Sequence, residues 1–96
     1  MAFAVAGKRW YLSNLKVSSA ASSAVVVSDG GQLTLEGGLV FGSVAANSHH
    51  LHCHNGGTCW ITQPYTIAAG AANHWRAERC GTIITSGTFT VTILNS

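Results

Sequence analysis

The feature that most constrains this chain is an internal repeat punctuated by glycine. Three segments, SDGGQLTLEGGLVFG, HNGGTCWITQPYTIA and RCGTIITSGTFTV, align without internal gaps and bring Gly31, Gly57 and Gly81 into register at separations of 26 and 24 residues. Repeats of about 20 to 50 residues are typical of solenoids, in which each unit stacks on the next. A less regular copy, RWYLSNLKVSS, precedes them. The sequence therefore predicts about four coils of one unit.

Each full unit contains three short β segments and no helical periodicity. One segment precedes the glycine (VVVS, LHCH, WRAE), one follows it (QLTL, TCWI, TIIT), and a third follows a second turn (LVF, YTI, FTV). Three strands in roughly 25 residues fit one coil of a parallel β-helix, in which each strand pairs with its copy about 4.8 Å away. The predicted fold is an all-β parallel β-helix with three short strands per coil.

Alternation along the strands sorts the apolar residues into inward columns, in which one position of the repeat stacks on itself. The four columns are Leu33, Cys59 and Ile83; Leu35, Ile61 and Thr85; Leu39, Tyr65 and Phe89; and Phe41, Ile67 and Val91. The glycine column Gly31, Gly57 and Gly81 fits a corner that needs either a positive φ or a close backbone approach. Because a β-branched residue tolerates a positive φ poorly, Gly57→Val is expected to be severely destabilising.

The repeat also sets the predicted domain organisation. At 96 residues the chain has the size of one domain. Residues 1–8 are expected to form a lead-in segment and residues 9–96 the β-helix domain, with coils at approximately 9–24, 25–50, 51–75 and 76–96.

An outward column is less polar than a water-facing surface should be. By the same parity Tyr11, Thr34, Trp60 and Ile84 point outward, and an aligned apolar stripe of this kind usually marks a contact surface. Only eight residues are formally charged, and they are scattered. The sequence therefore predicts a surface that contacts other proteins, with no patch for nucleic acid and no segment for membrane insertion.

The stretch SHHLHCHNGGTC, residues 48–59, concentrates the histidines. As a strand it places Leu51 and Cys53 inward and His50, His52 and His54 outward. A His-x-His pair on one strand face presents two imidazoles side by side, so these three residues are candidate metal ligands at a symmetry axis. No second set of ligands recurs at a matching spacing, which favours solvated or interface histidines and no cofactor.

Catalytic patterns are weak in this sequence. The only carboxylates are Asp29, Glu36 and Glu78, which the repeat places on different columns, whereas glycosidases need two carboxylates close together. Cysteines that face an apolar core have a raised pKa and are poor nucleophiles. We therefore expect no enzyme activity.

The stretch HLHCHNGGTCWITQPYTIAAGAANHWRAERCGTIITSGTFTVTI resembles the glycine-punctuated repeats of bacteriophage tail-fibre and tailspike-like proteins, and the likeness covers roughly residues 9–95. The resemblance implies a right-handed parallel β-helix in a virion appendage, commonly a homotrimer; in some trimeric phage spikes a His-x-His pair from each chain surrounds an iron on the three-fold axis. The expected role is a structural virion protein, a scaffold or a receptor contact, with other virion proteins and a host surface glycan as partners. Two alternatives remain open: a capsid decoration (cement) protein, and a carbohydrate-binding or depolymerising module that uses Trp60, Trp75 and the histidines.

Overall fold

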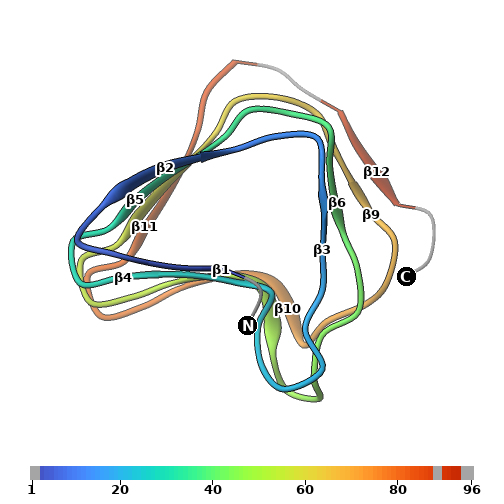
Figure 1. The fold of residues 1–96 in the computed structure, drawn as a ribbon, viewed down its shortest axis with the longest axis horizontal. Coiled ribbons are helices and arrows are strands. Elements are labelled where there is room, and N and C mark those ends of the chain that lie inside the picture. Colours follow the sequence, from blue (N-terminus) through green and yellow to red (C-terminus); the bar gives the residue numbers. More distant parts are fainter. Residues whose placement is uncertain (1–2, 88–89, 94–96) are drawn as a thin grey trace.

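The computed structural model describes residues 3–87 and 90–93, and the described chain is a stack of parallel β-strands without helices. Figure 1 shows the three sheets as the three sides of a coil, with successive coils lying over one another. Sheet A contains β1 (Phe3–Ala6), β4 (Val25–Ser28), β7 (His49–Cys53) and β10 (Asn73–Ala77). Sheet B contains β2 (Arg9–Leu12), β5 (Gln32–Leu35), β8 (Thr58–Ile61) and β11 (Thr82–Thr85). Sheet C contains β3 (Lys16–Val17), β6 (Leu39–Phe41), β9 (Tyr65–Ile67) and β12 (Val91–Ile93).

The register of the sheets confirms the predicted parallel β-helix. Leu33 pairs with Cys59, which pairs with Ile83, and Phe41 pairs with Ile67. Leu33, Cys59 and Phe41 are fully buried in the hydrophobic core. The two expected columns of sheet B are therefore rungs of the structure, and so are the pairs Leu39–Tyr65 and Phe41–Ile67 in sheet C.

The last rung of sheet C was predicted wrongly: Val91 pairs with Tyr65, and Ile93 takes the expected place of Val91 beside Ile67. The alignment without gaps failed here because Thr85 and Val91 are two residues further apart than the equivalent Ile61 and Tyr65. Phe89, assigned to the column of Tyr65, lies outside the described residues.

The N-terminal segment belongs to the stack. Residues 3–6, inside the expected lead-in, form β1, which pairs in parallel with β4 through Phe3–Val25 and Val5–Val27. Val5 is buried because it faces the same interior as Val27. Residues 3–6 therefore form the first strand of sheet A.

Gly57 is required at the corner because the backbone of another coil lies close to it, and not because of a positive φ, on which the Gly57→Val prediction was based. Positive φ occurs one and two residues earlier, at Asn55 (50°) and Gly56 (80°), and the N–H of Gly57 donates to the carbonyl of His54. Two consecutive positive φ values closed by this hydrogen bond describe a type I′ turn. Gly57 itself has no positive φ; a Cβ there would collide with the Val27 backbone of the preceding coil. Of the two reasons considered for the column, the close backbone approach is the correct one.

The same arrangement holds in the neighbouring coils. A Cβ at Gly31 would collide with the Val5 carbonyl, and one at Gly81 with the Cys53 carbonyl. Each corner glycine therefore lies directly over the end of a sheet A strand in the coil before it. In the last coil the turn is made by Arg79 and Cys80, both non-glycine residues with positive φ.

The core is densest in the middle of the stack and opens toward the last coil. Leu33, Leu51 and Ile61 are fully buried, whereas in the last coil Ile83 is only partly buried and Ile93 is 60% exposed. No helix in the described parts of the chain has the length and apolar character needed to cross a membrane.

Candidate functional site

The alternation of inward and outward side chains is interrupted once in strand β7, where the chain enters sheet A from sheet C. His50 and Leu51 are consecutive, yet both are buried, with 1% and 0% of their surface exposed. Ala24 and Val25 are likewise both buried at the same place in the coil before. Two neighbouring residues of a regular strand face opposite sides, so the backbone must bend here.

The prediction that His50 points outward with His52 and His54 is therefore wrong. His50 lies inside the corner, its ring 5.5 Å from the ring of Phe41 between centroids. His49 takes the outer position in its place, with its ring 5.3 Å from that of His52. The parity argument failed because it assumed a regular strand across the bend, and it misplaced His74 on the next rung for the same reason.

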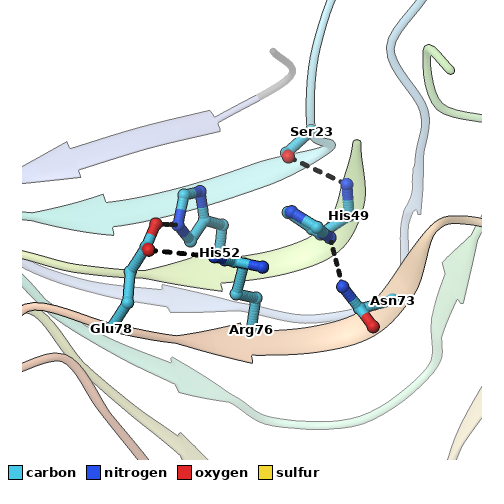
Figure 2. Close-up of polar contacts among 6 residues, drawn as sticks. All are labelled: Ser23, His49, His52, Asn73, Arg76 and Glu78. Carbon is cyan, nitrogen blue, oxygen red and sulfur yellow. Dashed lines mark hydrogen bonds and ion pairs between the residues drawn. The ribbon is translucent and has the colours of Figure 1, made fainter. Parts of the chain in front are cut away.

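The outer face of sheet A carries a polar cluster, shown in Figure 2. The Nε2 of His52 on β7 lies 2.7 Å from Oε1 of Glu78, and Nη2 of Arg76 on β10 donates to Oε2 of Glu78 at 3.1 Å. The backbone N–H of His49 donates to Oγ of Ser23 at 2.9 Å. The carboxylate thus binds one cationic and one imidazole group from two strands.

Charge and burial set the ionisation of this outer cluster. The Arg76 guanidinium, followed by the His52 ring, lowers the pKa of Glu78 to about 2, so the carboxylate is ionised at neutral pH. Burial, and then the proximity of His52 and Arg76, lowers the pKa of His49. The cluster is therefore a solvent-exposed ion pair of Arg76 and Glu78 with neutral His49 beside it.

The outer histidines do not form a metal centre within the chain. The rings of His52 and His54 lie 4.7 Å apart, but His50 lies on the inner side. Within residues 3–87 and 90–93, no three His, Cys, Asp or Glu side chains are placed to hold one metal ion. His50 is therefore not available as a ligand beside His52 and His54 on the outer face.

A second polar group lies inside the same corner, and we call it the corner hydrogen-bond chain. Nε2 of His50 lies 3.1 Å from the carbonyl oxygen of Gly42, and Nδ1 of His50 lies 2.9 Å from Nδ1 of His74. Nε2 of His74 lies 2.7 Å from the hydroxyl of Tyr65. The chain joins strands of sheet A to sheet C, and the ring of Phe41 packs against its members.

Burial dominates the acid-base properties of this chain. Burial, followed by the proximity of His50, lowers the pKa of His74 to about 4, and burial also lowers the pKa of His50. Burial raises the pKa of Tyr65 to about 12, although the Trp75 indole opposes this. All three titratable members are therefore neutral at pH 7.

The cysteines of the histidine-rich stretch face the core, as expected. Cys53 and Cys59 are fully buried and unpaired as disulfides, whereas Cys80 is exposed at the last turn. The contact with the Cys53 thiol, together with burial, raises the pKa of the Cys59 thiol far above its ordinary value. A buried thiol of this kind has no nucleophilic role.

Sheet B carries the predicted outward column on four successive rungs. Tyr11 pairs with Thr34, Thr34 with Trp60, and Trp60 with Ile84. Tyr11 is 55% exposed. Because small Thr34 lies between two large aromatic residues, the surface is hollowed into a cleft of about 270 Å³. The cleft is lined by Arg9, Tyr11, Thr34, Trp60 and Thr62.

One polar group of this cleft is held in place from the neighbouring rung. Both Nε and Nη2 of Arg9 donate to Oε1 of Gln32, at 2.9 and 2.7 Å. The guanidinium keeps further N–H donors beyond these two. The cleft on sheet B therefore combines aromatic walls, a threonine floor and a fixed cation.

The carboxylates are distributed as the repeat suggested. Asp29 is a turn residue with a φ of 52°, Glu36 is exposed, and Glu78 is bound by Arg76 and His52. The sequence interpretation missed His49 on the outer face, and it did not foresee the link from His50 to His74 and Tyr65. The available signal was the alignment of His50 and His74 on neighbouring rungs beside the aromatic residue Tyr65.

No protein-family model, curated protein or solved structure matches the chain.

Proposed function

We propose that this chain is a structural virion protein, part of a phage tail fibre or spike, in which the β-helix acts as a scaffold or receptor contact. The resemblance of its glycine-punctuated repeat to tail-fibre sequences supports the proposal. So does the stack of in-register parallel sheets, because each coil is hydrogen-bonded to its neighbours and the stack is a rigid support.

The observation that carries the proposal is the outward column Tyr11, Thr34, Trp60 and Ile84 on sheet B. Tyr11 and Ile84 are 55% and 38% exposed, and the column runs continuously along the stack. Copies of the same chain are the occupants we propose for this face, in a homotrimer. With eight formal charges and a net charge of +2, copies meet with little electrostatic repulsion.

A size measurement tests this association. In analytical ultracentrifugation over a range of concentrations we expect a trimer. The double variant Tyr11→Thr and Ile84→Thr should raise the dissociation constant of the trimer at least about tenfold for each apolar contact removed. Val40→Thr, on the outer side of β6 in sheet C, is the matched control and should leave the trimer intact. A wild-type monomer at every concentration would contradict the proposal.

The cleft on sheet B supports a second candidate function, binding of a saccharide. The apolar C–H face of a sugar ring stacks on aromatic side chains, and its hydroxyls accept hydrogen bonds from groups such as a guanidinium. Tyr11 and Trp60 supply two aromatic rings two rungs apart, and Arg9 supplies the donor. A cleft of about 270 Å³ is near the lower end of ligand-site volumes, which suits one sugar unit.

Glycan-array binding distinguishes this candidate from self-association through the same face. Trp60→Ala should lower binding of the best glycan at least about tenfold while leaving the unfolding transition in place. Trp10→Ala removes another exposed aromatic side chain that does not line the cleft, and it should leave binding unchanged. Equal loss in both variants, or no glycan bound by the wild type, would dismiss the saccharide candidate.

A further inference from the structure

The corner hydrogen-bond chain has only one arrangement of its protons at neutral pH. A carbonyl oxygen can only accept, so Nε2 of His50 must carry the proton that it donates to Gly42. Neutral His50 then has a bare Nδ1, which accepts from Nδ1–H of His74. Neutral His74 in turn has a bare Nε2, which accepts from the hydroxyl of Tyr65. The fixed carbonyl at one end thus sets the tautomer of both histidines.

One additional proton disrupts this arrangement. A proton on Nδ1 of His50 would face the Nδ1–H of His74 across a 2.9 Å contact, with two donors and no acceptor. A proton on Nε2 of His74 forces the Tyr65 hydroxyl to become the acceptor, and it places a cation against the ring of Phe41 in the core. Either route costs a buried hydrogen bond or buries a charge.

The neighbouring groups do not compensate for such a charge. The Tyr65 hydroxyl on β9 faces His74, and the Cys59 thiol on β8 lies near Tyr65. The raised pKa values of Tyr65 and Cys59 keep both groups neutral between pH 4 and pH 7. The backbone carbonyls of Gly42 and Ala69 favour a charged His50 but do not outweigh burial. Arg76, Glu78, His52 and His49 interact on the outer face of sheet A. In the described part of the chain no carboxylate binds either buried ring.

We propose that the corner hydrogen-bond chain is an acid-sensitive latch, which holds sheets A and C together at neutral pH and releases the corner between them when an additional proton enters it. The inference is independent of the proposed function, because it depends only on the interior of the coil.

The direction of the pH effect follows from the two protonation equilibria. His74 takes up a proton near its ordinary pKa of 6.5 in the unfolded chain, but only near 4 in the folded one. Stability from this group is therefore complete above about pH 6.5 and is lost as the pH falls toward 4. For one such proton the folding equilibrium constant should fall about 20-fold between pH 7 and pH 5. The stability from the Glu78 pair is present above its ordinary pKa of 4.5 and is lost as the pH falls from there toward 2, below this range.

Urea unfolding at pH 5, 6 and 7 tests the latch. The double variant His50→Leu and His74→Leu should lose at least about 20-fold of the wild-type pH effect, whatever its absolute stability, because the pKa of His50 is also lowered. His49→Gln on the outer face is the control: it removes only the pH effect of His49, whose pKa burial also lowers, and it should retain the effect of about 20-fold that depends on His74. An unchanged pH dependence in the double variant would overturn the proposal.

Two measurements on the wild type keep the inference testable if the double variant does not fold. Imidazole ¹⁵N shifts at pH 7 should show the proton on Nε2 of His50 and on Nδ1 of His74. At pH 5, hydrogen exchange corrected for intrinsic rates should increase in segments 42–50 and 65–74 before it increases in β5 and β8. The opposite tautomers, or equal exchange in the corner and in sheet B, would refute the latch.

Discussion

Gly57→Ala is expected to unfold the protein, or to lower its free energy of unfolding by more than about 4 kcal/mol. An added Cβ would lie 2.5 Å from the carbonyl carbon of Val27 and 2.8 Å from the amide nitrogen of Ser28. Both atoms belong to the backbone of β4 in the coil below, so no side-chain rotation relieves the collision. Because the free energy of unfolding of a domain is only about 5–15 kcal/mol, the loss caused by one displaced rung is a large fraction of it.

Two other glycines provide controls for this prediction. Gly70 has open space around its Cα and no positive φ, so Gly70→Ala should change stability by less than about 0.5 kcal/mol. Gly56 also has room for a Cβ but has a φ of 80°, so Gly56→Ala should cost about 1–2 kcal/mol from the left-handed conformation alone. Circular dichroism during urea unfolding measures all three variants. A Gly57→Ala protein as stable as Gly70→Ala would mean that the coils are not stacked in this register.

The predictability of the fold varies along each coil. Leu33, Cys59 and Ile83 could be placed from sequence because alternation along a short strand and repetition between coils give the same answer. The Asn55–Gly56 turn was also readable, since that pair favours positive φ at both positions. Where two independent signals agree, a residue can be assigned a side of the sheet.

His50 could not be placed because the corner between sheets C and A obeys neither signal. The chain bends there, so His50 and Leu51 both face the interior, and alternation assigns one of them wrongly. Repetition gives little help, since the small residue Ala24 occupies the equivalent position one coil earlier. The candidate site is therefore less predictable than the core, because its geometry depends on a backbone bend that no residue type in the sequence indicates.

The last coil illustrates a local conflict that the stack tolerates. Arg79 and Cys80 adopt φ values of 49° and 66°, in a turn that an Asn–Gly pair makes one coil earlier. Residues with a Cβ pay a cost of about 1–2 kcal/mol each in this conformation. The corner persists because Gly81 behind it makes the same close approach, here to Cys53, as Gly57 makes to Val27. Contact between coils, more than local turn preference, thus determines the shape of the corner.

Phe41→Ala is the second variant with a large expected effect, a loss of about 3–5 kcal/mol in the free energy of unfolding. The ring is fully buried, and its centroid lies 5.5, 5.5 and 5.3 Å from the rings of His50, Tyr65 and His74. Removing it leaves a cavity enclosed by sheets A and C, which the rigid rungs cannot collapse to fill. Urea unfolding at pH 7 measures the loss, and Val40→Ala on the outer side of the same strand should cost less than about 1 kcal/mol.

The same variant also links packing to the acid response of the corner. Phe41 covers both imidazoles, so its loss admits water to them and should raise the pKa of His74 from about 4 toward its ordinary value of 6.5. The fall in stability between pH 7 and pH 5 should therefore become smaller in Phe41→Ala than in the wild type, although the variant is less stable at pH 7. Phe41→Leu should keep most of the wild-type pH dependence because it still excludes water. If Phe41→Ala retains the full pH dependence, burial by this ring is not what keeps His74 neutral.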